Sequence, residues 1–268
     1  MAWDDKLHPF LMHSRWPQPA VFAHRGFSAR LPENTMSAFA AAIALGCEYL
    51  ETDVHATKDG HLVIFHDDTL ERMTGQTGTI EEMNLSELRE LRVTGNEPIP
   101  LLTELLSEFP DARINIDPKQ DSAVQPLLAL IADARAWDRV CVGSFSGTRL
   151  NHMRSEAGIR LCTAAAPSEV RRLYLARFGL PAGTIAANCL QIPPRKYRIR
   201  LVDQAFIQAA HCRQLPVHIW TINDLDEMKN LLGYGVDGIM TDEVETAMNL
   251  FQDCIWQSNV CGSGFEGE

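Results

Sequence analysis

The sequence predicts a (β/α)8 barrel, and three observations support this fold class. Short apolar or β-branched runs alternate with segments of helical periodicity from residue 20 onward. The runs number roughly eight, which is the number of βα units that closes a TIM barrel. The chain has 268 residues and 46% hydrophobic content, which suffices for the core of one large domain. We therefore expect a single TIM-barrel domain spanning residues 1–268.

The expected strands follow one another with helical stretches between them. They are residues 20–23, 48–54, 112–116, 140–143, 159–162, 187–192, 216–220 and 237–240. Thr35 is suited to begin the first helix, and Gly46 stands where a left-handed cap would end it. Near the end of the chain, Asp242 followed by Glu245 resembles a capping box. We therefore expect Asp242 to act as the N-cap of the final helix.

One segment interrupts this alternation after the second strand. Residues 62–66 form a short extended run, and residues 67–100 then contain a turn-rich stretch at 74–78 and a helix start at 84–87. We expect an insertion at the mouth of the barrel. The alternative fold is a doubly wound open sheet, which would place a glycine-rich phosphate loop after the first strand. This chain has His24-Arg25-Gly26 there.

The ends and the charge of the chain restrict its location and partners. Residues 1–19 lack an uninterrupted apolar stretch, so we expect neither a signal sequence nor stable membrane insertion, and a cytoplasmic location by default. Residues 257–268 hold three glycines, two serines and two acidic residues, which predicts a loosely ordered tail. A net charge of −11 without a Lys/Arg run argues against a nucleic-acid partner, and an anionic substrate would need a locally positive pocket. The oligomeric state stays open.

The cysteines are odd in number and scattered, and most lie inside apolar runs. This pattern predicts reduced core thiols rather than a disulfide framework. None of them shows the paired spacing of zinc ligands. The seven are Cys47, Cys141, Cys162, Cys189, Cys212, Cys254 and Cys261.

Charged and polar residues recur where the expected strands end, and a barrel brings those ends together on one face. Glu51 and Asp53 lie two apart on one strand, so both carboxylates point the same way and repel unless a cation holds them. Oxygen ligands of this kind favour Mg²⁺ or Ca²⁺. Asp117 and Lys119 repeat the two-residue spacing on the next strand, which adds a third carboxylate and an ammonium group.

Two imidazoles and a guanidinium accompany these charges, on His24, His66 and Arg25. A cation bound by carboxylates and flanked by imidazoles and permanent positive charges suits a phosphate diester, whose charge must be neutralised while protons are moved. We therefore expect a metal-dependent phosphodiesterase. One histidine would begin neutral as the base and the other protonated as the acid, so the rate should peak at intermediate pH.

The strand-end residues fall into short motifs spread over about residues 21–242. The motifs are His24-Arg25-Gly26, Pro32-Glu33-Asn34-Thr35, Glu51-Thr52-Asp53, Thr57-Lys58-Asp59-Gly60, His66-Asp67, Asp117-Pro118-Lys119 and Trp220-Thr221-Ile222-Asn223. In combination they resemble the glycerophosphodiester phosphodiesterase family. That resemblance implies a βα barrel with a small insertion after the second strand, a divalent cation on three carboxylates, and two histidines acting as acid and base.

The resemblance also implies a role for each matching residue. The metal would be bound by Glu51, Asp53 and Asp117, protons would be moved by His24 and His66, the phosphate would be held by Arg25 and Lys119, and Trp220 would line the alcohol pocket. One departure concerns Asp117, because the family usually has Glu there, and the shorter side chain implies a longer or water-mediated metal contact. Asp does occur at that place in the related sphingomyelinase D enzymes.

Other polar residues have simpler explanations. Glu33 and Asn34 are expected to fix the loop or cap the first helix, and Trp220 considered alone would be a core residue. Histidines 61, 152, 211 and 218 are expected to be satisfied polar groups. His55 follows Asp53 by two, so it could face the pocket and support the substrate or a neighbouring side chain.

Several functions remain as alternatives. Lysophospholipase D-type or other phosphodiesterase activity on the same fold is one, but residues 67–100 show no long apolar stretch for an acyl chain, which favours small deacylated diesters. A non-catalytic barrel that binds a phosphorylated metabolite is another, although it has no need of two histidines. A metal amidohydrolase would show paired histidines on the first strand, where His24 is followed by Arg25. The order of attack, by the neighbouring glycerol hydroxyl through a cyclic phosphate or by water directly, also stays open.

Overall fold

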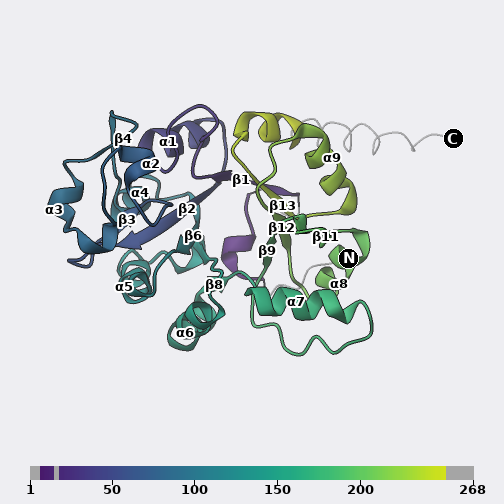
Figure 1. Cartoon of the computed structure of the whole chain (residues 1–268). Helices are drawn as coiled ribbons and strands as arrows, with labels where there is room; N and C mark the ends of the chain where they lie inside the picture. The colour runs from purple at the N-terminus through teal and green to yellow at the C-terminus, as the bar shows by residue number, and fades with distance from the viewer. Residues whose placement is uncertain (1–6, 15–17, 252–268) are drawn as a thin grey trace.

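The computed structural model describes residues 7–14 and 18–251 and contains a barrel of parallel strands surrounded by helices (Figure 1). Nine strands form the main sheet, and one of them, β3, pairs antiparallel with β2 and lies off the main path, which leaves eight. Their order is β8-β7-β6-β2-β1-β13-β12-β9, and every neighbouring pair on this path is parallel. The eight are β1 (Ala20–His24), β2 (Tyr49–Ala56), β6 (Arg113–Pro118), β7 (Val140–Val142), β8 (Cys162–Thr163), β9 (Leu190–Ile192), β12 (Val217–Ile219) and β13 (Gly238–Thr241).

The two ends of this path meet between β8 and β9. Ala164 and Cys189 form an isolated parallel bridge there, and the amide of Ala165 donates to the carbonyl of Cys189 at 2.9 Å. The amide of Asn188 donates to the carbonyl of Thr163 at the same distance. The eight parallel strands therefore close on themselves, as the sequence predicts for a TIM barrel, and the seam at β8 and β9 is held by few backbone hydrogen bonds.

The expected fifth strand, residues 159–162, is wrong in its position. Residues Gly158–Arg160 form a 3-10 turn, and the Ile159 side chain is 96% exposed. Gly158 ends the preceding helix with a positive φ of 62°, so the chain still needs a turn before it enters the sheet. The strand begins only at Cys162, so Ile159, which the sequence places in it, lies outside it.

Helices cover the outside of the barrel (Figure 1). Thr35 caps the first of them, accepting a hydrogen bond from the amide of Ala38 at 3.3 Å, and Gly46 follows its end with a φ of 84°. Both predictions for this helix are confirmed. The longer helices are α1 (Met36–Ala44), α4 (Leu102–Glu108), α5 (Val124–Asp133), α6 (Gly147–Ala157), α7 (Pro167–Ala176), α8 (Gln204–His211), α9 (Leu225–Tyr234) and a final one at 244–251.

Residues 67–100 pack beside β2 and β3 (Leu62–Ile64), on one flank of the barrel (Figure 1). They form α2 (Glu71–Thr74), a 3-10 turn at Ile80–Glu82, α3 (Leu85–Leu88) and the short strands β4 (Arg92–Val93) and β5 (Glu97–Pro98). The helix start expected at 84–87 is present, because the Glu87 carboxylate accepts from the amide of Asn84 at 2.8 Å. A separate apolar cluster that includes Leu70, Ile80 and Leu88 holds this segment together.

Alternation along the strands sorts side chains between the barrel interior and the helix layer. Phe22 and Tyr49 belong to an inner cluster, whereas their neighbours Val21 and Leu50 pack with the helices. The 3-10 turn at Pro9–Leu11 inserts Phe10 into the inner cluster, and the Tyr49 hydroxyl donates to the Phe10 carbonyl at 2.7 Å. Glu51 and Asp53 share the alternation of Tyr49, so they too face inward, nearer the carboxyl end of β2.

The cysteines within the described ranges, Cys47, Cys141, Cys162, Cys189 and Cys212, form no disulfides, as predicted. Cys254, Cys261 and the expected tail at 257–268 lie outside those ranges. No helix in the part of the chain that the structure describes is long and apolar enough to cross a membrane.

Candidate active site

The ends of β1 and β2 bring His24, Arg25 and Glu51 together. His24 is in register with Glu51, and its Nε2 lies 3.9 Å from the Glu51 carboxylate. The Arg25 amide donates both to the Glu51 carbonyl at 3.0 Å and to the Glu51 carboxylate at 3.2 Å. The turn that follows requires Gly26, which has a φ of 82° and whose Cβ, if present, would lie 2.7 Å from the Ala38 backbone. Close backbone packing thus fixes where His24 and Arg25 point.

Asp53 and Asp117 are direct partners across β2 and β6, and Lys119 joins them. The Lys119 Nζ lies 2.6 Å from Asp53 and 2.9 Å from Asp117. Burial alone would raise the pKa of Asp53, but the charges of Lys119 and Arg25 hold it below its usual value. Burial raises the pKa of Asp117, in spite of Lys119. The ammonium group therefore balances part of the negative charge at this edge.

Glu51 is the carboxylate whose charge is balanced least. Burial, followed by repulsion from Asp53, raises the pKa of Glu51 to about 7. Two buried carboxylates that repel each other on one face of a strand are stabilised by a cation, and an all-oxygen donor set suits Mg²⁺ or Ca²⁺. The chemistry of Glu51, Asp53 and Asp117 thus fits such an ion, although within the described ranges their oxygens do not all lie within 4.8 Å of one another. Lys119 holds two of the three carboxylates in this arrangement.

Asp242 has a different role from the expected N-cap. The final helix begins at residue 244, and the Asp242 carboxylate instead accepts hydrogen bonds from His24 Nδ1, Ser28 Oγ and Asn223 Nδ2, each at 2.7 Å. Although Asp242 is partly buried, these donors hold its pKa well below the usual range. Burial opposes protonation of His24, but the hydrogen bond to Asp242 and the charge of Glu51 outweigh it, so the pKa of His24 is raised.

The Asp242 contact also determines the tautomer of neutral His24. Because Nδ1 donates to the carboxylate, the proton of the neutral ring resides on Nδ1, and Nε2 is left to accept one. The sequence did not predict that Asp242 is the hydrogen-bond partner of His24. Asp242 follows β13, which pairs with β1, so closure of the barrel creates the contact.

His66 has a similar arrangement on the other side of the carboxylates. Its Nδ1 lies 2.7 Å from Asp67, and its positive charge, when present, lowers the pKa of Asp53. Arg72 binds both Asp67 and Glu33, and its hydrogen bonds are the main reason that the pKa of Asp67 falls to about 2. Both histidines therefore have Nδ1 against a carboxylate and Nε2 available.

The remaining polar residues of the first loop hold the site charges in place. Arg25 reaches Glu33 at 3.0 Å and lies 3.3 Å from Asp53. Asn34 donates to Asp53 at 3.1 Å and accepts from the Thr52 hydroxyl at 2.9 Å. Glu33 and Asn34 thus fix the loop, as expected, while Thr35 is the cap.

Trp220 and His55 occupy two further positions around the site. Trp220 follows β12, is half-buried, and packs edge-on against Phe145 with ring centroids 5.7 Å apart. The Phe145 side chain is 71% exposed, so the two rings form an aromatic rim. His55 is fully buried, and its Nε2 lies 3.3 Å from the His66 carbonyl, where it supports the segment that carries His66.

Comparisons with known proteins extend over nearly the whole barrel. Residues 24–246 match the sequence profile of the glycerophosphoryl diester phosphodiesterase family. A Mycobacterium tuberculosis protein named probable glycerophosphodiester phosphodiesterase 2 is 36% identical over 84% of this chain and 88% of its own length. A rat protein named lysophospholipase D is 27% identical, with 88% of each chain covered. An Oleispira antarctica phosphodiesterase, solved with its product sn-glycerol-3-phosphate, has the same fold, with a TM-score of 0.72, 24% identity, and coverage of 88% of this chain and 97% of that one.

Proposed function

The chain belongs to the glycerophosphoryl diester phosphodiesterase family, and from that premise we propose that it hydrolyses glycerophosphodiesters to glycerol 3-phosphate and an alcohol. One observation carries the proposal. His24 and His66, each with Nδ1 against a carboxylate, flank the buried pair Glu51 and Asp53. This arrangement offers two proton-transfer groups beside a cation site.

We assign metal binding to Glu51, Asp53 and Asp117 and phosphate binding to Arg25 and Lys119. When bound, a divalent cation, Mg²⁺ or Ca²⁺, would stabilise the additional negative charge of the transition state as a Lewis acid. Lys119 and Arg25 neutralise the charge of the diester and orient it between the histidines. Phosphate oxygens would compete with Asp53 and Asp117 for the Lys119 ammonium.

The Nε2 atoms of His24 and His66 move the protons. One neutral ring takes a proton from the attacking group, which is either water or the neighbouring glycerol hydroxyl, and the other, protonated, delivers one to the leaving alcohol. If the hydroxyl attacks first, water then opens the cyclic phosphate to give glycerol 3-phosphate. Asp242 and Asp67 keep the rings oriented through Nδ1, and the hydrogen bond to Asp242 also raises the pKa of His24. This division of labour gives a rate that falls at both low and high pH.

The alcohol side of the substrate is assigned to the rim formed by Trp220 and Phe145. The segment at 67–100 contributes only short elements, and its apolar residues are used in its own cluster. A small deacylated diester therefore suits this barrel better than a lysophospholipid. The rat relative named lysophospholipase D keeps the second substrate class as the alternative.

The proposal is tested by incubating the full chain with glycerophosphocholine and, separately, with lysophosphatidylcholine. Each reaction is run with Mg²⁺, with Ca²⁺ and with excess chelator. We expect metal-dependent release of glycerol 3-phosphate from the first substrate and slower turnover of the second. Equal or faster cleavage of the lysophospholipid would favour the alternative, and release that survives chelation would contradict the metal role of Glu51, Asp53 and Asp117.

A further inference from the structure

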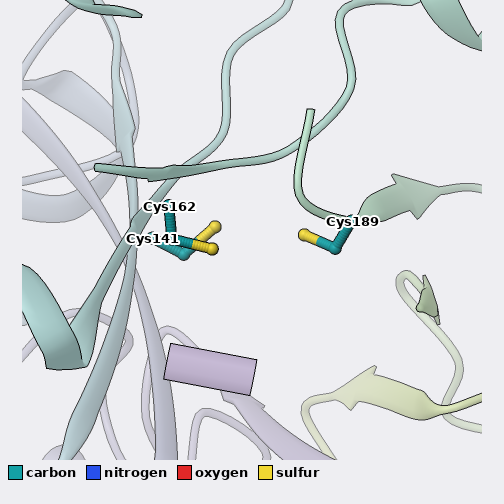
Figure 2. Close-up of side chains that lie close together, drawn as sticks. All are labelled: Cys141, Cys162 and Cys189. Atoms are coloured by element: carbon teal, nitrogen blue, oxygen red, sulfur yellow. The ribbon is translucent and has the colours of Figure 1, made fainter. Parts of the chain in front are cut away.

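Three cysteines from distant parts of the sequence meet inside the barrel. Cys141, Cys162 and Cys189 are fully buried, and their sulfur atoms all lie within 4.8 Å of one another. Figure 2 shows the thiols of Cys141 and Cys162 directed toward that of Cys189. None of the three has a role in the proton transfer, metal binding or phosphate binding proposed for the active site.

Strand register explains the convergence. Cys141 and Cys162 are direct partners across β7 and β8, and Cys189 is the bridge partner of Ala164, two residues after Cys162. The neighbours of Cys141 pack with the helix layer, whereas all three cysteines belong to the inner cluster. The residues thus share one inward-facing patch of the barrel wall.

A buried histidine lies beside Cys189, although its ring nitrogens are not within 4.8 Å of all three sulfur atoms. His218 on β12 is 3% exposed, and its Nδ1 finds no hydrogen-bond partner within the described ranges, so the satisfied polar group expected from the sequence is not met at this nitrogen. The His218 ring is close enough to the Cys189 thiol to help lower the pKa of that thiol. Hydrogen bonds from Cys141, Cys162 and His218 lower the pKa of Cys189, while burial raises the pKa of the other two thiols. The cluster is therefore polar within an apolar surrounding.

We propose that Cys141, Cys162, Cys189 and His218 form a buried binding site for a thiophilic metal ion, with Zn²⁺ as the best match. Three sulfurs and one imidazole are a recognised tetrahedral zinc set. A Zn–S distance of about 2.3 Å places tetrahedral sulfurs about 3.8 Å apart, so the thiols need to approach one another by no more than about 1 Å. The His218 ring lies outside this close group and has further to move to become the fourth ligand. The hard oxygen donors of the catalytic edge suit a different class of ion.

The position of the site suggests what the ion does. Cys141 and Cys162 lie on one side of the seam between β8 and β9, and Cys189 and His218 lie on the other. That seam is held by an isolated bridge, and β8 has only two residues. A bound ion would cross-link the seam, and because the thiols are inaccessible it would enter during folding.

Metal analysis of the full chain tests the site. The protein is produced with added zinc, purified under reducing conditions and dialysed against EDTA, which removes weakly held ions from oxygen ligands. We expect about one zinc per chain to remain in the wild type and in Glu51→Gln, and to be lost in Cys162→Ala. Cys47→Ala is the matched control, because Cys47 is a buried thiol outside the cluster, and it should keep the zinc. Absence of zinc from the wild type, or full retention in Cys162→Ala, overturns the proposal.

A second measurement covers the case in which Cys162→Ala does not fold. X-ray absorption of the zinc in the wild-type protein reports the ligand atoms directly, and we expect sulfur at about 2.3 Å. A shell of only oxygen and nitrogen would place the ion elsewhere and overturn the proposal. Refolding with Co²⁺ should likewise give sulfur-to-cobalt charge-transfer absorption, and the absence of this absorption would also overturn the proposal.

Discussion

Replacement of Asp242 by Asn tests whether this carboxylate orients and charges the catalytic histidine. The Asp242 carboxylate accepts the His24 Nδ1 proton at 2.7 Å, together with donors from Ser28 and Asn223. Asn keeps the shape of the side chain but removes its charge. Its NH2 group cannot accept a hydrogen bond, so at least one of the donors that bind Asp242 loses its acceptor. A hydrogen bond to a charged group contributes about 1.5–3 kcal/mol, so we expect kcat/KM to fall by about 10-fold to 100-fold.

The same substitution should move the pH profile in a defined direction. Asp242 raises the pKa of His24, so its loss lowers that pKa. If His24 is the acid, the high-pH limb moves to lower pH, and if it is the base, the low-pH limb moves to lower pH. The shift is therefore downward in either case, whichever limb His24 controls.

The assay is glycerol 3-phosphate release across the pH range, measured as kcat and KM for Asp242→Asn and the wild type. Asp226→Asn is the control, because Asp226 is an exposed carboxylate with only a loose contact to Lys229 at 3.5 Å. An unchanged rate and unchanged limbs in Asp242→Asn would refute the positioning role. A shift of a limb to higher pH would contradict the electrostatic argument.

Three further predictions concern the backbone turn and the cation edge. Gly26→Ala should lower the free energy of unfolding, measured in urea, by about 3 kcal/mol, because the substitution combines a positive φ with a 2.7 Å clash on Ala38. Gly60→Ala, at a nearly equal φ but in open space, should lower it by only about 1 kcal/mol. Lys119→Met should lower the free energy of unfolding of the metal-free protein by about 3 kcal/mol, because it leaves Asp53 and Asp117 without their ammonium partner. Mg²⁺ or Ca²⁺ should therefore raise the thermal midpoint of the variant more than that of the wild type. An equal rise in both proteins would contradict the idea that Lys119 and the metal ion balance the same carboxylates. Asp117→Glu should reduce the metal concentration needed for half-maximal activity, and an unchanged titration would show that the shorter side chain is no handicap.

The sequence predicted most of the barrel because parallel strands have local signals. Apolar runs and the two-residue period located seven of the eight strands and set Glu51 and Asp53 on one face. The fifth strand was misplaced because Ile159 has strand character in the sequence, while Gly158 turns it into solvent. The strand propensity of a residue does not show whether it lies in the strand or in the turn that precedes it.

Contacts that form only when the barrel closes could not be predicted from the sequence. Asp242 fits a capping box with Glu245, and only the pairing of β1 with β13 shows that its carboxylate reaches His24. The cysteines were considered only for their spacing along the chain, which excluded a zinc site. Register across β7, β8 and β9 places three of them together, and no local pattern encodes that register.

Proton transfer by His24 and His66 is tested by measuring glycerol 3-phosphate release from glycerophosphocholine by the wild type, His24→Ala and His66→Ala, each with saturating Mg²⁺ or Ca²⁺. His61→Ala is the control, because His61 is an exposed histidine whose ion-pair partner is Asp59, at 3.9 Å, and none of the proposed metal ligands. We expect at least about a 100-fold loss of kcat in His24→Ala and in His66→Ala and none in the control, with metal binding retained. Near wild-type turnover in either His24→Ala or His66→Ala would contradict proton transfer by this pair of histidines.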